Sequence, residues 1–553
     1  MNMFSSFQRD QIINTLEMEA FDVLVIGGGI TGAGIALDAI TRGLKTGVIE
    51  MQDFAAGTSS RSTKLVHGGL RYLKQFELKM VGEVGKERAI VYENGPHVTR
   101  PEWMMLPFYK GSTLGSFTTN IGLMLYDWLA DVKKEERRKM LSAQQAINKE
   151  PLIKQDGLLG AGVYVEYKTD DARLTIEVLK KAAEYGAHAI NYMKAVDFIY
   201  DETGRITGVL AKDVIKGTKH AVKAKKIINA TGPWVDTLRE LDHSKKEKAL
   251  HLTKGVHVVF PKSIFPLKQA IYFDSPDGRM IFAIPRDGKT YVGTTDTDYE
   301  GDKKHPVMEK EEAVYLLDAI NFMFPSLNLK LEHVESSWAG LRPLIAEDEI
   351  NHPSEISRKD EIFVSDTGLI SMAGGKLTGY RKMAEQAVDI MVNQLKAEEG
   401  ILYSSSETKT LPISGGEVGG SSGFESFKKR KLSEGIEMGI EKTQAELLVE
   451  RYGKNVNMLY GLYQKYQQDA VAEKIDPIVF IQLIYALENE LAYHPSDFFV
   501  RRTGALFFDI SMVKREKKAV IQYMAKCLSW SEEEKERYTA DINHMLQEAE
   551  IPH

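Results

Sequence analysis

The pattern of hydrophobic and polar positions near the N-terminus predicts a strand, a helix and a second strand in close succession. Four consecutive apolar residues, Val23 to Ile26, are typical of a buried strand. Apolar residues at helical spacing follow from Ile35 to Ile40, and Gly43 is expected to end this helix. A second strand is expected over residues 44–50. The order indicates a βαβ unit over about residues 20–50.

The glycines between the first strand and the helix indicate the chemistry of this unit. Gly27, Gly29 and Gly32 form G-x-G-x-x-G, and Glu50 ends the second strand 50 − 27 = 23 positions after the first glycine. Such glycines allow a tight turn, a close approach of a pyrophosphate and close packing of helix on strand. The free N–H groups and positive dipole end of the helix favour phosphate. The spacing therefore predicts a dinucleotide site, with Glu50 accepting hydrogen bonds from a ribose.

Two further strand–glycine signals lie far along the chain. Lys226–Asn229 reads as a buried strand that ends at Ala230-Thr-Gly232, and Leu369–Ala373 is followed by Gly374 and Gly375. Three such signals, near residues 26, 229 and 373, can converge on one ligand. A nicotinamide domain is normally one contiguous block, so this dispersal favours a flavin dinucleotide.

The remaining pattern predicts an α/β chain of several domains. Residues 251–300 alternate in strand fashion and predict an antiparallel sheet, whereas residues 76–150 look helical and charged. Ser- and Gly-rich residues 403–423 look like a flexible linker, and everything after them looks helical. The domains expected are a discontinuous Rossmann-like FAD-binding domain, a substrate domain with a mixed or antiparallel sheet, a linker and a C-terminal all-helical domain. The FAD-binding domain is expected over residues 1–80, 151–240 and 340–400, and the substrate domain over residues 81–150 and 241–339. The linker is expected over residues 401–424, and the helical domain over residues 425–553.

Composition limits the class of protein and the cellular compartment. At 553 residues the chain is too long for one core, and a net charge of −7 gives no footprint for nucleic acid. The single cysteine, Cys527, excludes an internal disulfide framework and fits a reducing, cytoplasmic compartment. No apolar run reaches the roughly 20 residues of a membrane span. Residues 1–20 predict an amphipathic helix, which lies on a membrane surface or, as we favour, on the protein itself.

A second chemistry-rich segment, Gly57–Leu73, combines hydroxyls, cations and glycines within 73 − 57 + 1 = 17 residues. Hydroxyls and backbone amides can hydrogen-bond the edge of a flavin, and cations can hold an anionic substrate. A polar surface loop is the alternative interpretation, and the double glycine before Leu70-Arg-Tyr72 argues against it.

Together these segments resemble the FAD-dependent glycerol-3-phosphate dehydrogenases, which are flavoproteins of the glycine oxidase and D-amino-acid oxidase type. The resemblance covers nearly the whole chain. Besides Gly27–Gly34 and Ser59–Leu73, it rests on Asn229–Asp236, Lys254–His257, Gly293–Asp298, Ala339–Leu344, Ala373–Arg381 and Asp497–Thr503.

The resemblance implies roles for particular residues. Those implied to bind FAD are Gly27, Gly29 and Gly32 at the pyrophosphate, Glu50 at the ribose, Ser59, Ser60, Lys64 and His67 near the flavin, Ala230, Thr231 and Gly232 in the channel wall, and Gly374 and Gly375 below the pyrimidine end. Those implied to form the substrate site are Arg71, Tyr72, His257, Arg342 and Lys376. No metal site is expected.

These roles suit a phosphorylated alcohol. A phosphate dianion needs convergent cations, for which Arg71, Arg342 and Lys376 are candidates. His257 is the best candidate base for the C2 hydroxyl by its ordinary pKa, and Arg342 could instead stabilise an alkoxide. We therefore expect oxidation of sn-glycerol 3-phosphate to dihydroxyacetone phosphate in glycerol catabolism, by hydride transfer from C2 to FAD.

The electron acceptor is expected to be a membrane quinone, reached through peripheral membrane contact, and a homodimer is left open. Three alternatives stand beside this expectation. The first is an oxidase that passes the electrons to oxygen and forms hydrogen peroxide. The second is an amine or amino-acid oxidase on the same fold, and the third is a flavin-binding module without catalysis.

Overall fold

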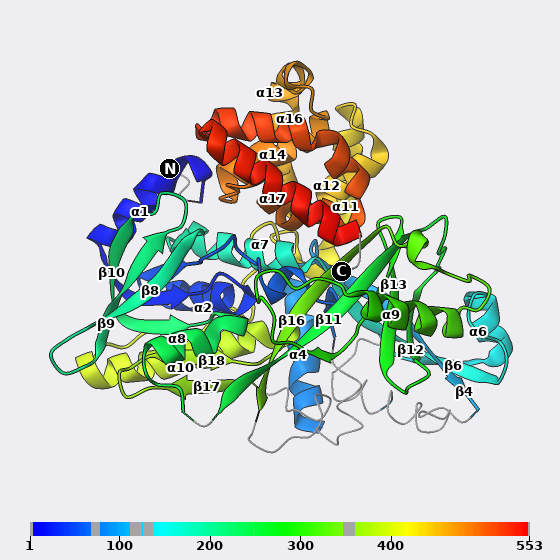
Figure 1. Ribbon diagram of the computed structural model, residues 1–553, viewed down its shortest axis with the longest axis horizontal. Coiled ribbons are helices and arrows are strands. Elements are labelled where there is room, and N and C mark those ends of the chain that lie inside the picture. The colour runs from blue at the N-terminus through cyan, green and yellow to red at the C-terminus, as the bar shows by residue number, and fades with distance from the viewer. Residues whose placement is uncertain are drawn as a thin grey trace.

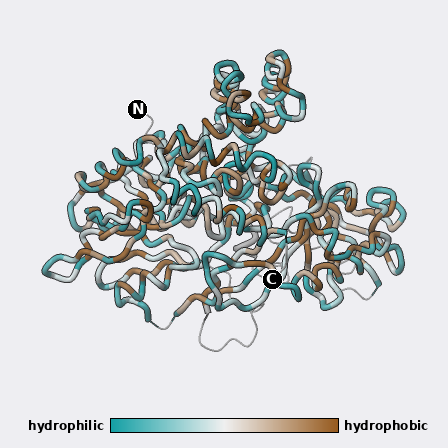
Figure 2. Tube along the Cα trace, turned by 45° about the horizontal axis from the view of Figure 1, so that its top comes forward, coloured by the Kyte–Doolittle hydropathy of each residue, from teal (hydrophilic) through white to brown (hydrophobic). Residues whose placement is uncertain are grey.

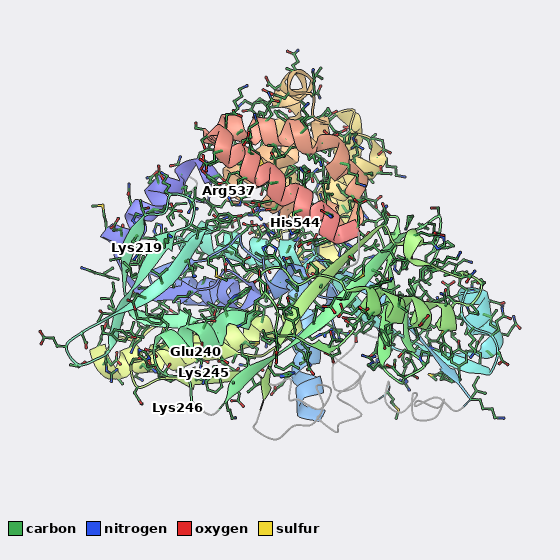
Figure 3. All side chains as sticks on the ribbon, viewed as in Figure 1. Lys219, Glu240, Lys245, Lys246, Arg537 and His544 are labelled. Carbon is green, nitrogen blue, oxygen red and sulfur yellow. The ribbon has the colours of Figure 1, made fainter. Side chains whose placement is uncertain are left out.

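The computed structural model describes residues 4–67, 78–110, 124, 136–246, 248–346 and 360–550. Two sheets lie next to each other with their covering helices, and the C-terminal helices pack across the top of both (Figure 1). Apolar residues run through the interior of the sheets, and hydrophilic residues concentrate at the outer turns (Figure 2). Charged side chains such as Lys219 and Lys246 project outward from the surface (Figure 3).

The first sheet brings the three strand–glycine signals together, as predicted. Its strand order is β17-β18-β10-β1-β2-β7, and β10 also pairs with the β9–β8 hairpin. β18, β10, β1, β2 and β7 run parallel, so Ile26, Asn229 and Ser371 lie side by side near the carboxyl ends of their strands. The bounds are β1 Ala20–Ile26, β2 Thr46–Ile49, β7 His188–Ile190, β8 Met193–Tyr200, β9 Ile206–Asp213, β10 Lys219–Asn229, β17 Glu361–Val364 and β18 Ile370–Ala373.

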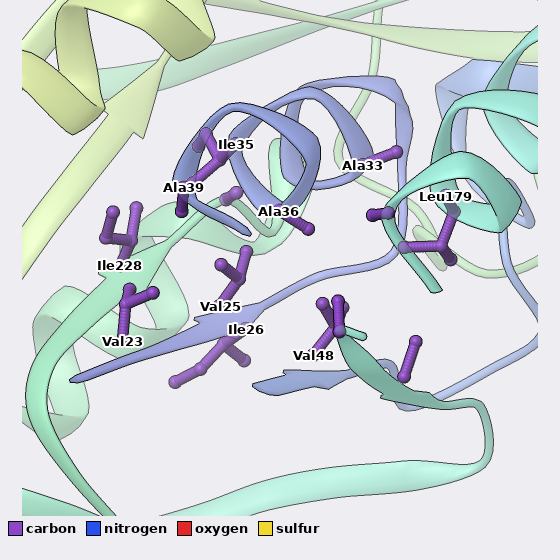
Figure 4. Packing of buried hydrophobic residues seen from close by; sticks show 14 of the residues in the cluster. Val23, Val25, Ile26, Ala33, Ile35, Ala36, Ala39, Val48, Leu179 and Ile228 are labelled. Carbon is purple, nitrogen blue, oxygen red and sulfur yellow. The ribbon is translucent and has the colours of Figure 1, made fainter. Parts of the chain in front are cut away.

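Helix α2 (Ile30–Thr41) packs on β1, with Ala36 and Ala39 next to Val23 and Val25 (Figure 4). α7 (Asp171–Glu184) and α10 (Tyr380–Glu399) flank α2 on the same face. The expected βαβ unit is therefore present, buried between two further helices.

The N-terminal helix α1 (Arg9–Met18) packs against β7 and β10. Its apolar residues Ile12, Ile13 and Leu16 are all buried within the protein core. The interpretation that this amphipathic helix packs on the protein itself is therefore confirmed. No described helix is long and apolar enough to cross a membrane.

The second sheet is largely antiparallel, as residues 251–300 predicted, with one parallel pairing of β12 on β4. Its strand order is β15-β11-β14-β13-β12-β4-β6-β3, with β16 paired to β11 and β5 to β6. The bounds are β3 Leu65–Val66, β4 Thr99–Tyr109, β5 Lys139–Ser142, β6 Leu158–Thr169, β11 Ala249–Pro261, β12 Ala270–Asp274, β13 Met280–Arg286, β14 Lys289–Gly293, β15 Thr297–Asp298 and β16 Ser336–Ala346. α6 (Ala143–Lys149) packs on β6, and α9 (Lys310–Met323) packs on β11 and β14. α4 (Leu78–Asn94) contacts β4, and its Val91 belongs to the core of the first sheet.

Two features of this sheet differ from the sequence predictions. Residues 76–150 are helical only in part, because β4 crosses the middle of that stretch and pairs with β6 along its whole length. β6 and β16 both lie in the second sheet. All of β6 and most of β16 fall within residues 151–240 and 340–400, which were expected in the FAD-binding domain. Local patterns show that a segment is extended but not which sheet it joins. The domain boundaries themselves stay a prediction.

The C-terminal part is helical, as expected. Its α-helices are α11 Gly420–Glu437, α12 Lys442–Tyr452, α13 Val456–Glu473, α14 Pro477–Asn489, α15 Ala505–Phe508, α16 Ile510–Leu528 and α17 Glu532–Glu550, and a π-helix spans Asp497–Arg502. The expected linker is held against the first domain: Thr408 donates to Asp38, and Asn94 donates to the Thr408 carbonyl at 3.0 Å. Its last glycines begin α11.

Candidate active site

A cavity of about 620 Å³ follows the carboxyl ends of β1, β10 and β18 and extends to β11 and β16 of the second sheet. Its volume is typical of cofactor sites, and the carboxyl edge of a parallel sheet is where α/β folds bind ligands. All three strand–glycine segments contribute to its lining. The three segments that were predicted to converge therefore meet in the cavity as well as in the sheet.

The glycines of the first motif shape this cavity in two ways. Gly27 has φ +114°, and a Cβ there would lie 2.5 Å from the Ala230 carbonyl oxygen. A Cβ on Gly32 would lie 1.9 Å from the Gly27 carbonyl oxygen. Gly27 and Gly29 line the cavity, whereas Gly32 lies behind it and lets α2 approach β1. The backbone is thus bare where a pyrophosphate would meet the helix N-terminus.

Glu50 lies in the lining next to these glycines. Its two carboxylate oxygens accept hydrogen bonds from the backbone N–H groups of Gly28 at 2.7 Å and Gln52 at 2.8 Å. Burial raises the pKa of this carboxyl group. An ionised carboxylate has about four acceptor positions, so capacity for ribose hydroxyls is left after these two bonds.

Only part of the polar segment after Glu50 faces the cavity. Ser59 and His67 line it; the Ser59 hydroxyl accepts from the Ile30 N–H at 3.0 Å and thereby caps α2. Ser60 and Lys64 do not line it. Lys64 Nζ donates to Asp171 at 2.6 Å inside the protein, so its charge is already neutralised. The predicted Arg71 and Tyr72 lie outside the described residues.

The later glycine segments add to the same lining. Ala230, Thr231, Gly232, Gly374 and Gly375 all line the cavity. Gly374 and Gly375 have φ +71° and +89°, a conformation that side chains rarely adopt.

Arg342, Lys376 and His257 all line the cavity. Arg342 donates to Asp296 at 3.0 Å and to the Thr294 hydroxyl at 2.9 Å. Asp296 therefore orients Arg342. Two cations that lie 376 − 342 = 34 residues apart thus line one cavity.

His257 is held in place from several sides and is only 2% exposed. Its ring stacks on Trp338 at 4.8 Å between centroids, and a Cβ on Gly293 would lie 2.2 Å from the ring. Nε2 is 3.0 Å from the Thr63 hydroxyl. Burial, followed by the charges of Arg342 and Lys64, holds the pKa of His257 well below its usual range. The ring is therefore neutral at pH 7.

Comparison with known proteins agrees with this site. The family described as FAD dependent oxidoreductase matches residues 22–381, which include all of the first sheet except the first two residues of β1. The chain belongs to the FAD-dependent oxidoreductase family. A second family, the C-terminal domain of alpha-glycerophosphate oxidase, matches residues 406–535 of this oxidoreductase.

Relatives extend over the full length of this FAD-dependent oxidoreductase. The aerobic glycerol-3-phosphate dehydrogenase of Bacillus subtilis is 57% identical over 551 residues, covering 100% of this chain and 99% of that one. Its counterpart in Staphylococcus haemolyticus is 55% identical over 99% and 98% of the two chains. A solved glycerol-3-phosphate dehydrogenase from Bacillus halodurans, complexed with FAD, has a TM-score of 0.86 and 48% identity over 99% of each chain.

FAD is the cofactor of this oxidoreductase, and the residues of the cavity fit it. Bare glycine backbone meets a helix N-terminus, Glu50 stands beside it, and hydroxyls and further glycines continue along the cavity. Gly27 and Gly29 would hold the pyrophosphate of FAD, and Glu50 the adenosine ribose. Ser59, His67 and Gly374 would lie nearer the flavin ring. The individual contacts stay predictions.

Sequence reasoning did not single out Thr63 or Trp338, which hold His257 in place. Thr63 lies in the hydroxyl-rich segment that was recognised, but its partner is 194 residues away. Which of several neighbouring hydroxyls meets the histidine depends on how the two sheets dock. A local pattern cannot contain that information.

Proposed function

We propose that this FAD-dependent oxidoreductase oxidises sn-glycerol 3-phosphate to dihydroxyacetone phosphate and passes the electrons to a membrane quinone. The observation that carries the proposal is that His257, Arg342 and Lys376 all line the cavity that the glycine segments form. The names of the full-length relatives support the substrate, because both are glycerol-3-phosphate dehydrogenases. The proposal places the enzyme in glycerol catabolism at the cytoplasmic face of the membrane.

The cations bind the substrate in this proposal. Arg342 presents a planar guanidinium that Asp296 holds in one orientation, and Lys376 adds a second positive charge to the lining of the same cavity. An arginine fork suits a phosphate oxygen pair or a developing alkoxide. Both roles require a cation whose position is set before the substrate arrives.

The alcohol must lose a hydride from C2 and a proton from its hydroxyl. When bound, FAD supplies the ring that accepts the hydride. Arg342 is proposed to stabilise negative charge on the hydroxyl oxygen, and His257 is a candidate proton acceptor by its ordinary pKa alone. The lowered pKa of His257 keeps it neutral but also makes it a weak proton acceptor.

A glycerol-3-phosphate oxidase is the second candidate function. The match of residues 406–535 to a domain named after alpha-glycerophosphate oxidase favours it. The two activities share the reduction of FAD and differ only in where the electrons go afterwards.

Anaerobic reduction tests the proposal. Glycerol 3-phosphate added without oxygen to the FAD-loaded protein is expected to bleach the visible flavin absorbance, whereas glycerol and an amino acid are not. An unbleached flavin would contradict the substrate. Reoxidation then separates the acceptors: a soluble quinone analogue is expected to restore the colour quickly, with little peroxide formed in air. Stoichiometric peroxide would favour the oxidase.

A further inference from the structure

Thr63 contacts His257, a buried histidine of the cavity lining. The segment Ser62–Lys64 is fixed to the second sheet through its backbone: Trp338 Nε1 donates to the Ser62 carbonyl at 3.1 Å, and the Tyr291 hydroxyl donates to the Thr63 carbonyl at 3.0 Å. Asp171 holds both neighbours of Thr63, at 2.7 Å from the Ser62 hydroxyl and 2.6 Å from Lys64 Nζ. The backbone therefore presents the Thr63 hydroxyl to His257 in one position.

The two nitrogens of His257 have unequal surroundings. Nε2 is 3.0 Å from the Thr63 hydroxyl, whereas Nδ1 is buried without a hydrogen-bond partner among the described residues. A neutral imidazole carries one hydrogen, so this contact and the tautomer are linked. If Nδ1 carried the hydrogen, it would be a buried N–H without an acceptor, which native structures tolerate less than an under-satisfied acceptor.

The charges around the ring argue in the same direction. Arg342 and Lys64 are the positive groups that act on His257, and both disfavour a further positive charge on the imidazole. Trp338 covers one face of the ring, and Gly293 allows close contact from the neighbouring strand. Among the described residues, the nearby carboxylates of Asp171 and Asp296 are paired with Lys64 and Arg342, and neither is among the groups that shift the pKa of His257.

We infer that His257 acts on the cavity through Thr63: Nε2–H donates to the Thr63 hydroxyl oxygen, and the Thr63 O–H in turn donates to an acceptor atom of the bound ligand. The inference rests on the proposed function and refines it. Thr63 becomes a ligand-contacting residue that no pattern singled out, and His257 becomes its positioning residue rather than the proton acceptor. No covalent step is involved, because both groups keep their own hydrogens.

The tautomer can be measured directly on the FAD-loaded full chain. Nitrogen-15 NMR of labelled histidine distinguishes protonated from unprotonated ring nitrogens, and the His257→Gln spectrum identifies the His257 signals. We expect a neutral ring with the hydrogen on Nε2 from pH 6 to pH 8. A hydrogen on Nδ1, or a ring that becomes charged in this range, would overturn the inference.

Rates of anaerobic flavin reduction provide the second test. Thr63→Val removes the hydroxyl and is expected to slow reduction about tenfold to a hundredfold, the effect of one hydrogen bond, and Thr63→Ser should restore most of the rate. His257→Gln keeps an N–H donor without a titratable group, so it should stay within about tenfold of the wild type, with an unchanged pH profile. His257→Leu should slow reduction as much as Thr63→Val does. The double variant His257→Leu/Thr63→Val should be no slower than either single variant. The exposed Thr207→Val is the matched control.

A general base would behave differently. His257→Gln would then fall by about a hundredfold to ten-thousandfold, as His257→Leu would, and its pH profile would change. A wild-type flavin that glycerol 3-phosphate does not bleach would instead contradict the proposed function. The NMR measurement would still decide the tautomer in that case, so the two failures are distinguishable.

Discussion

A single missing Cβ decides whether the dinucleotide site can form. Gly32 packs against the Gly27 carbonyl so closely that any side chain would collide with backbone, which cannot rotate away. Overpacking in an interior costs about 1–3 kcal/mol or more when the backbone has to move. The displaced atoms belong to Gly27, which lines the cavity.

We therefore predict that Gly32→Ala lowers both thermal stability and FAD content, the latter seen in the ratio of flavin to protein absorbance. Gly461→Ala in α13 is the matched control, since its new Cβ meets nothing within 4 Å. Alanine there should leave the flavin content alone and change helix stability by up to about 1 kcal/mol in the favourable direction. Equal flavin content in both variants would contradict the packing argument.

Arg342 is predicted to matter for turnover but not for binding of the cofactor. It belongs to β16 of the second sheet and is oriented by Asp296, away from the glycine motif. Arg342→Ala is predicted to keep FAD but to lower the rate of flavin reduction about 100- to 1000-fold, the usual loss when an oriented donor at a developing charge is removed. Stopped-flow reduction with glycerol 3-phosphate measures this. Unchanged kinetics would remove Arg342 from the site.

At this scale, the residues predictable from sequence are those whose role depends on local spacing. Gly27, Gly29 and Glu50 belong to one βαβ unit, and all three line the cavity. Lys64 was misplaced because Asp171, which neutralises it, is 107 residues away. A cation in a polar segment looks the same whether it faces a ligand or a buried carboxylate.

At the scale of elements, the π-helix Asp497–Arg502 is joined to the loop after β2 by buried charges. Asp53, three residues after Glu50, accepts two hydrogen bonds from Arg502 at 2.7 and 2.9 Å and one from Arg501. The two guanidinium groups hold the pKa of Asp53 well below its usual range, against the effect of burial. The C-terminal helical part is thus tied to the loop that follows β2 and Glu50.

Removing this carboxylate deprives two buried cations of the partner they share and, among the described carboxylates, leaves Arg501 with Asp497 alone and Arg502 with Glu490 alone. Asp53→Asn is predicted to destabilise the protein by about 3–5 kcal/mol, measured as a lower urea midpoint, and to weaken FAD retention. Glu240→Gln is the control, because Glu240 pairs with Lys245 on the surface at 2.6 Å, where ion pairs contribute little (Figure 3). A loss of equal size in both variants would argue against a special role for the buried cluster.

Elements were predictable where periodicity was clear and their neighbours were adjacent in sequence. The hairpin strands β13 and β14 were expected and are present. β4 and β6 were not recognised as partners, because about fifty residues separate Thr99–Tyr109 from Leu158–Thr169 in the chain. Pairing across such a distance is set by docking of the two sheets rather than by local pattern.

At the scale of the whole molecule, the protein buries neutral histidines where its parts meet. His494 lies between the rings of Tyr192 and Tyr538, at 4.2 and 4.1 Å, and burial lowers its pKa to about 3. Burial also lowers the pKa of His97 and His257 well below the usual range. The unfolded chain protonates these residues near pH 6.5, while the folded protein does not.

Because the unfolded state then binds more protons, acid favours unfolding. Stability is predicted to fall as the pH drops below about 6.5, by up to about 1.4 kcal/mol per pH unit for each of these histidines. Thermal midpoints of the holoenzyme at pH 7.5, 6.5 and 5.5 measure the slope. His494→Phe keeps an aromatic ring in the stack without a titratable group, so its slope should be shallower. A slope equal to that of the wild type would contradict this origin.

The dispersal of the FAD cavity over the chain also affects synthesis. Its first strand ends at Ile26, and its last glycines begin at Gly374, 374 − 26 = 348 residues later. At roughly 5–20 residues per second, a ribosome needs about 20–70 s to make that interval. The nascent chain therefore carries an unfinished, glycine-rich edge of sheet through most of its synthesis, and FAD can be captured only when the polypeptide is two-thirds made.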